Sequence, residues 1–156
     1  MSDSADQAEA AMFAWGKAAA AGMHAYPQPA GLVDSLWRAN LVTEVVYLTS
    51  GWTPFIAGVV DDIRRRTYTE DVPFSIVGST MTSGASGWRT SALMDGAAKA
   101  DWIERQLETG TRIELLADDQ HHDILPFDRV RDLGGQIFKI AYRGENHDPW
   151  DGAVDD

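Results

Sequence analysis

The sequence predicts an α/β domain in which helices cover both faces of a mainly parallel sheet of about four strands. Short apolar runs typical of buried strands alternate with segments of helical periodicity, in the order strand, helix, strand, loop, helix, strand, helix, strand. Crossover connections of this kind join parallel strands with right-handed geometry, which places helices on the two faces of the sheet. No internal repeat is evident.

The individual elements are predicted from their residue patterns. Aliphatic and β-branched residues predict strands at residues 44–50, 72–77, 112–117 and 136–142. Helical spacing of apolar residues predicts helices at residues 53–63, 97–109 and 126–133. Residues 81–96 are rich in glycine and small hydroxyl residues and are expected to form a long loop over the strand ends. Together these elements predict a three-layer Rossmann-like domain.

The chain divides into three parts by composition: residues 1–28, 29–143 and 144–156. The first part contains an Ala-rich helix, expected at residues 4–23, and a proline-containing linker. The second part is the α/β domain, which begins with a short helix at residues 30–40. The third part is an acidic tail, either disordered or folded back by Trp150. The N-terminal helix either covers a sheet edge or pairs with a second copy in a homodimer.

Composition restricts the classes of function. The chain has 156 residues, of which 44% are hydrophobic, so it fits one domain with its own core. The formal net charge of −11 argues against a broad nucleic-acid-binding surface and permits a protein partner. The one basic run, Arg64-Arg65-Arg66, is expected at a helix C-terminus, where cations are favoured. The absence of cysteine, of a membrane-length apolar run and of a secretion signal predicts a cytoplasmic protein.

Three acids gather after the strand at residues 112–117. Asp118 and Asp119 follow it directly, and Asp123 comes five residues after Asp118. Ligands of open α/β sheets bind beyond the strand C-termini, where such acids are placed to hold a divalent cation or an activated water. The alternative is that these acids only cap the turn. The adjacent His121 and His122 point in different directions in a loop, so no zinc site is expected, although one of them can orient the acidic turn.

Three segments together resemble the second half of a haloacid dehalogenase-like (HAD) phosphatase domain. They are VVYLTSGW at residues 45–52, AAKADWIERQL at residues 97–107 and IELLADDQHHD at residues 113–123. The resemblance covers roughly residues 29–143, and the chain is similar to compact HAD domains associated with RNA repair proteins and to other phosphatases without a cap. Family members carry Thr or Ser at one strand end, Lys near a helix start and a pair of acids at the next strand end.

The resemblance implies a role for each matching residue. Thr49 or Ser50 would hydrogen-bond a transferring phosphoryl group, and Lys99 would neutralise its charge. Asp118, with Asp119 or Asp123, would hold Mg²⁺. Without the resemblance, Lys99 is expected to be a solvated helix residue, and Thr49 and Ser50 are expected only to form a turn. Trp52, Trp88 and His122 are the residues that we expect to border the pocket.

The chain departs from the family at its first motif, an Asp-x-Asp at the end of the first strand. No such sequence precedes Val45, so the nucleophilic aspartate is missing. Asp34 lies on an expected helix, and Asp148 and Asp151 follow a polar segment instead of a strand.

Three hypotheses follow from this departure. The first is a pseudoenzyme that binds a phosphorylated small molecule, a nucleotide or a protein partner. The second is a Mg²⁺-dependent phosphatase, acting on a phosphomonoester or a nucleic-acid end, whose nucleophile is supplied elsewhere. The third is an acidic interaction or inhibitor protein, for which the fold is only a scaffold.

Overall fold

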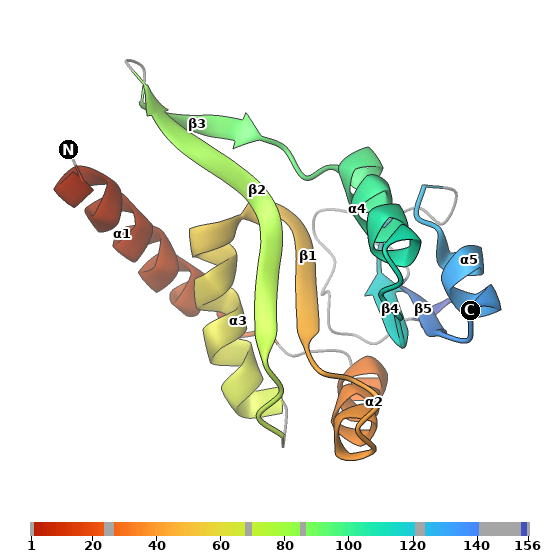
Figure 1. Ribbon diagram of the computed structural model, residues 1–156. Helices are drawn as coiled ribbons and strands as arrows, with labels where there is room; N and C mark the ends of the chain where they lie inside the picture. The colour runs from red at the N-terminus through yellow and green to blue at the C-terminus, as the bar shows by residue number, and fades with distance from the viewer. Residues whose placement is uncertain are drawn as a thin grey trace.

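The computed structural model describes residues 2–23, 27–67, 70–84, 87–120, 124–140 and 154–155. Helices and strands alternate along most of this chain (Figure 1). In order they are α1 (Ser2–Ala20), α2 (Pro27–Arg38), β1 (Val45–Trp52), α3 (Thr53–Thr67), β2 (Phe74–Gly84), β3 (Gly87–Ala92), α4 (Gly96–Glu108), β4 (Leu115–Asp118), α5 (Phe127–Asp132), β5 (Gln136–Ile140) and β6 (Val154–Asp155). The predicted α/β class is confirmed.

The strands form two sheets of three strands each, where the sequence predicts one sheet. In the first sheet β1 pairs with β2 in parallel, and β2 pairs with β3 antiparallel. In the second, β4 pairs with β5 in parallel, and β5 pairs with β6 antiparallel. Each sheet therefore contains one parallel and one antiparallel pair, where the sequence predicts mainly parallel strands. In the described chain no hydrogen-bonded ladder joins β1 to β4, so these two strands lie at the edges of separate sheets.

Residues 81–96, predicted as a loop, form a β-hairpin arm over much of their length. β2 continues to Gly84, and β3 returns along it with Gly84 opposite Gly87. The hydroxyl groups of Thr80 and Ser91 lie 2.9 Å apart across the ladder. Gly87 has a φ of +104°, a conformation that favours glycine. The two glycines thus stand at the turn end of the hairpin, and Thr80 and Ser91 join its strands at the other end.

The two faces of β1 meet different parts of the protein. Leu48 packs against the buried cluster of Ile103, Leu125, Phe127 and Val130, which α4, α5 and the loop before α5 supply. Tyr47 points the other way, with its ring 5.9 Å from the ring of Phe74 in an edge-to-face arrangement. The partly buried residues around the cluster are Leu48, Ala100, Trp102, Leu107, Ile113, Leu116 and Ile137. The cluster thus touches both sheets, through Leu48 on one and Leu116 on the other.

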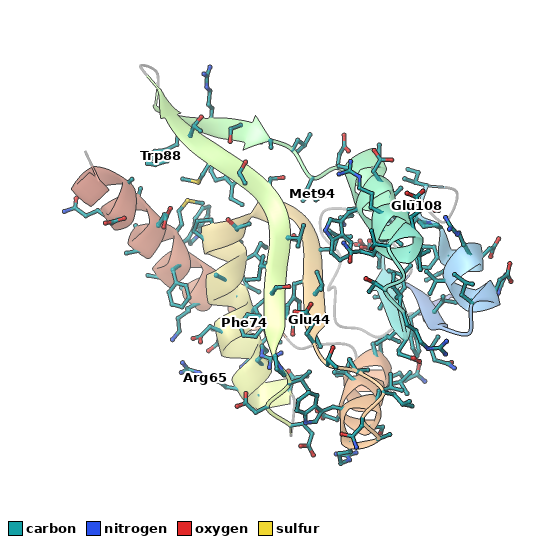
Figure 2. The ribbon with its side chains drawn as sticks, in the orientation of Figure 1. Glu44, Arg65, Phe74, Trp88, Met94 and Glu108 are labelled. Carbon is teal, nitrogen blue, oxygen red and sulfur yellow. The ribbon has the colours of Figure 1, made fainter. Side chains whose placement is uncertain are left out.

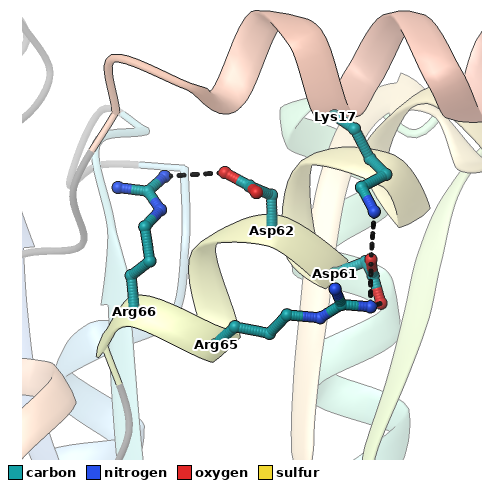
Figure 3. A network of polar contacts seen from close by, with 5 residues as sticks. All are labelled: Lys17, Asp61, Asp62, Arg65 and Arg66. Atoms are coloured by element: carbon teal, nitrogen blue, oxygen red, sulfur yellow. Dashed lines mark hydrogen bonds and ion pairs between the residues drawn. The ribbon is translucent and has the colours of Figure 1, made fainter.

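Helix α1 packs along α3 (Figure 1) and not against a free sheet edge. The two helices approach most closely at Gly16 and Gly58, where an added Cβ would overlap the backbone of the facing helix. Lys17 of α1 pairs with Asp61 of α3 at 3.2 Å (Figure 3). No helix in the described ranges is both long and apolar enough to cross a membrane.

The arginine run lies in the last turn of α3, as predicted, and each of its side chains has a protein partner. Arg66 donates to the backbone carbonyls of Ala20 and Met23 at 2.8 Å, which satisfies acceptors at the end of α1. It also pairs with Asp62 one turn earlier, and Arg65 pairs with Asp61 in the same way (Figure 3). The guanidinium of Arg64 stacks 4.4 Å from the centre of the Phe74 ring. These contacts support the structural interpretation of the basic run.

Candidate functional site

The candidate site lies where the carboxyl ends of β1 and β4 meet the first turn of α4. Asp95 caps this helix, since its carboxylate accepts a hydrogen bond from the backbone N–H of Ala98 at 2.9 Å. Capping fixes the start of α4 and therefore the position of Lys99 in its first turn. Side-chain atoms of Gln120 lie about 3.0 Å from where a Cβ on Gly96 would stand, so the acidic turn packs directly against this helix start.

Lys99 and Asp118 form a buried ion pair. The Lys99 Nζ atom lies 3.2 Å from Oδ2 of Asp118, and the two side chains are 9% and 11% exposed. The other oxygen, Oδ1, accepts the backbone N–H of Gln120 at 2.7 Å. Burial raises the pKa of Asp118 above its ordinary value of 3.8, and outweighs the lowering by Lys99 and by the Gln120 hydrogen bond. The structure thus brings together two residues for which the resemblance implied a role in the site.

A second set of hydrogen bonds joins β1, β2 and the segment before α4. The hydroxyl of Ser50 donates to the carbonyl of Met94 at 2.7 Å. The hydroxyl of Ser79, only 1% exposed, donates to the carbonyl of Ser50 at 2.7 Å and accepts the N–H of Met94 at 2.9 Å. Figure 2 shows Met94 between β3 and α4. Sequence reasoning did not select Ser79 for the site, although its place after the apolar run of the second strand was a usable signal.

The remaining predicted residues of β1 and the hairpin lie further out. Thr49 Oγ1 accepts the backbone N–H of Gly51 at 3.1 Å, a local bond typical of a turn former. Trp52 donates from Nε1 to Thr90 Oγ1 at 2.8 Å and so ties the end of β1 to the hairpin. Trp88 lies on β3, away from α4, and is 37% exposed (Figure 2). Ser50 is therefore the hydroxyl residue of β1 that the structure connects to the start of α4.

The acidic turn is only partly described. Asp119 is exposed, whereas Asp123 and His122 lie outside the described residues. Over the part of the chain that the structure describes, no three His, Asp or Glu side chains come together as a metal-ligand group. Mg²⁺ commonly takes only one or two carboxylates together with phosphate oxygens and water, so Asp118 and Asp119 are chemically adequate for such a site.

Asp34, the upstream acid considered as a nucleophile, lies on α2 and is 6% exposed. Its Oδ1 accepts the backbone N–H of Glu70 at 3.3 Å. This hydrogen bond holds α2 against the segment before β2. It lies at the other ends of the strands from Lys99. The other two candidates, Asp148 and Asp151, lie outside the described residues.

A groove lined by apolar residues along its strands, and by polar residues such as Glu44, Gln106 and Glu114, separates the facing edges of β1 and β4. Its volume is about 570 Å³. The lining residues include Val45, Val46, Tyr47 and Leu48 of β1, Leu115, Leu116 and Ala117 of β4, Trp102, Ile103 and Gln106 of α4, and Val33 and Leu36 of α2. We call this feature the β1–β4 groove. It begins near Glu44, beside α2 (Figure 2), and runs along both strands toward the candidate site.

Comparison with protein-family models, with curated proteins and with solved structures gives no match to this chain. The HAD-like resemblance therefore remains a prediction based on residues 45–52, 97–107 and 113–123.

Proposed function

We propose that this chain is a HAD-like domain without a nucleophilic aspartate, and that it binds a phosphorylated ligand beside Lys99. The observation that carries this proposal is the buried Lys99–Asp118 pair at the carboxyl ends of the strands. A cation held in a partly desolvated position attracts phosphate more strongly than one in water, because the effective dielectric constant is lower there. Ser50 lies on the strand end tied to the same helix start, and its hydroxyl would donate to the ligand in place of the Met94 carbonyl.

Asp118 is both an orienting group and a competitor in this proposal. Its carboxylate holds the Lys99 ammonium in place, and a phosphate must share or replace that contact. The raised pKa of Asp118 favours its neutral form more than for an ordinary aspartate, which weakens its competition with an anion. We therefore expect phosphate affinity to increase as the pH falls, over the range above about pH 6 in which a phosphomonoester keeps its second charge.

Calorimetric titration with inorganic phosphate, simple phosphomonoesters and nucleoside monophosphates tests the proposal. Lys99→Met removes the cation, and Lys17→Met is the matched control because Lys17 pairs with Asp61 on the α1–α3 surface. We expect Lys99→Met to weaken binding by about 10- to 150-fold, the equivalent of a charged hydrogen bond of roughly 1.5–3 kcal/mol. Lys17→Met should leave it unchanged. The proposal would be contradicted if the parent, Lys99→Met and Lys17→Met bound with equal affinity, or if the parent bound none of the ligands.

A Mg²⁺-dependent phosphatase is the second candidate, and the β1–β4 groove favours it. An additional strand in this groove would end beside Lys99 and Asp118, where a nucleophile from another segment or chain would be needed. Mg²⁺ would be held by Asp118 with Asp119 or Asp123. A strand there would also complete the Rossmann-like sheet that the sequence predicts.

Hydrolysis assays separate the two candidates. The intact chain and Asp118→Asn are compared, with Mg²⁺, on phosphate monoesters and on oligonucleotides phosphorylated at the 5′ or 3′ end. Turnover that Asp118→Asn abolishes would support the phosphatase. Phosphate binding without turnover in either protein would support the binding domain. For both candidates we propose a cytoplasmic location, because a cysteine-free chain is compatible with a reducing compartment; cell fractionation tests it.

A further inference from the structure

We propose that the β1–β4 groove is the docking site for an extended peptide segment of a protein partner. The segment would run parallel to β1 and β4, hydrogen-bond to both, and join the two sheets into one. This inference rests on the strand edges and the groove, and it does not depend on phosphate binding at Lys99.

Both walls of the groove are strand edges. Within the described ranges β1 is paired only with β2 and β4 only with β5, so each strand has a second edge that faces the groove. Backbone N–H and C=O groups along such an edge need partners, and a row of them is a template for another strand. An extended peptide satisfies two facing edges at once, which a compact small molecule of the same volume cannot do.

The two edges run in the same direction. β1 ends near the start of α4, where Ser50 bonds Met94, and β4 ends at Asp118, which holds Lys99 in the first turn of the same helix. At their other ends both strands approach α2 (Figure 1). A strand between them can therefore be parallel to both neighbours, as in a buried parallel sheet.

The groove also fixes the chemistry of its occupant. Trp102 and Ile103 of α4 line the groove between the two strands, and Val33 and Leu36 of α2 line it at its amino end. Leu48 and Leu116, on opposite sides of the groove, pack on the same buried cluster, so the groove offers apolar contacts to a side chain between them. The paired segments Val45–Leu48 and Leu115–Asp118 are each four residues long, which sets the length of the occupant at roughly four to six residues. The net charge of −11 favours basic residues on either side of its apolar core.

Hydrogen exchange with a synthetic peptide tests the proposal. The probe is acetyl-Lys-Thr-Val-Ile-Val-Val-Thr-Lys-amide, and its matched control carries N-methyl groups on alternate amides, which removes donors but keeps the side chains. With the intact chain, we expect the probe to slow amide exchange in residues 45–48 and 115–118 together, and to leave α1 unchanged. The control peptide should protect neither segment.

Orientation is tested with a nitroxide label on the peptide. A label at its C-terminus should broaden the NMR signals of Gly51 and Asp119, and a label at its N-terminus should broaden that of Glu44. The reverse pattern would overturn the parallel arrangement. Ala117→Trp places a large side chain in the groove and should abolish protection by the peptide while retaining the circular dichroism spectrum of the parent.

Three results would overturn the proposal. The first is no protection, or protection of only one of the two strands. The second is equal protection by the N-methylated peptide, which would show that side-chain packing alone drives binding. The third is concentration-dependent dimerisation of the chain that protects both strands without any peptide, which would make a second copy the occupant.

Discussion

At Lys99 and Asp118, desolvation and charge pairing act in opposite directions on one pair of side chains. Burial penalises both charges, while the 3.2 Å contact and the Gln120 hydrogen bond stabilise the ionised carboxylate. For Asp118 the burial effect is larger, because its pKa is raised overall. Perturbed pKa values of this kind occur at functional sites and also in structural ion-pair networks.

The raised pKa predicts how stability changes with pH. Folding favours the protonated form of Asp118, so its contribution to stability is fully present below pH 3.8 and is lost as the pH rises through the raised pKa. Asp118→Asn lacks this titration. The free energy of unfolding of the parent, relative to Asp118→Asn, should therefore fall as the pH increases above 3.8. Urea unfolding of both proteins over a pH series measures this difference in the free energy of unfolding. If the parent became more stable relative to Asp118→Asn as the pH rises, the pKa of Asp118 would not be raised.

Lys99→Met should destabilise the protein strongly at neutral pH and weakly in acid. At pH 7 it leaves the Asp118 carboxylate buried without its cation, which costs about 3–5 kcal/mol. In acid the carboxyl group is protonated and the cost is smaller. The double variant Lys99→Met, Asp118→Leu removes both charges and should recover most of the stability. A pH-independent loss in Lys99→Met would indicate that the alkyl chain of Lys99, and not its charge, is what matters.

Ser79→Ala tests the hydrogen bonds that join β1, β2 and the start of α4. The change leaves the carbonyl of Ser50 and the N–H of Met94 without this buried partner. We expect a loss of about 1–3 kcal/mol in the free energy of unfolding, measured with urea. Ser91→Ala is the control, because Ser91 has a similar hydroxyl bond at an exposed position on the hairpin and should cost much less. A similar loss in both variants would argue against a special role for Ser79.

At the scale of elements, the α1–α3 contact depends on glycine. Gly16→Ala and Gly58→Ala each place a methyl group against the facing backbone, and should cost about 1–3 kcal/mol through overpacking. Gly31→Ala in α2 meets nothing within 4 Å, so it should instead stabilise its helix by roughly 0.5–1 kcal/mol. Thermal unfolding of the three variants gives the comparison. Unchanged stability in both α1–α3 variants would mean that the helices can move apart at no cost.

Prediction from sequence succeeded for helices and failed for the hairpin, for a physical reason. The apolar stripe of α3 and the Gly110 stop of α4 are local signals, and both helices begin and end near their expected residues. The β2–β3 hairpin is rich in Ser, Thr and Gly, which also dominate loops, and its strands are stabilised by pairing with each other. Strand pairing is a contact between distant residues, so the local pattern could not distinguish this arm from a loop.

At the scale of the whole molecule, the buried cluster holds the two sheets together. Ile103 of α4 is 1% exposed and belongs to this cluster, which contacts β1 through Leu48 and β4 through Leu116. Ile103→Ala should cost about 2–5 kcal/mol and should reduce cooperativity, so that the fluorescence and circular dichroism transitions no longer coincide. Leu133→Ala, at a residue 56% exposed, is the control and should stay within about 0.5 kcal/mol of the parent. Coincident transitions in Ile103→Ala would indicate that other contacts couple the sheets.

The sequence by itself determined the α/β class, the helices and the position of Asp118 at the end of a strand. These features depend on periodicity, capping and the positions of acids after apolar runs, all of which are local properties of the chain. Only the tertiary structure decided that the strands divide into two sheets, that Ser79 joins β1 to the start of α4, and that α1 packs on α3. Each of these features depends on backbone groups and side chains that are far apart in the sequence. Which of these groups come into contact is decided by the strand edges and helix faces that remain available once the local elements have formed.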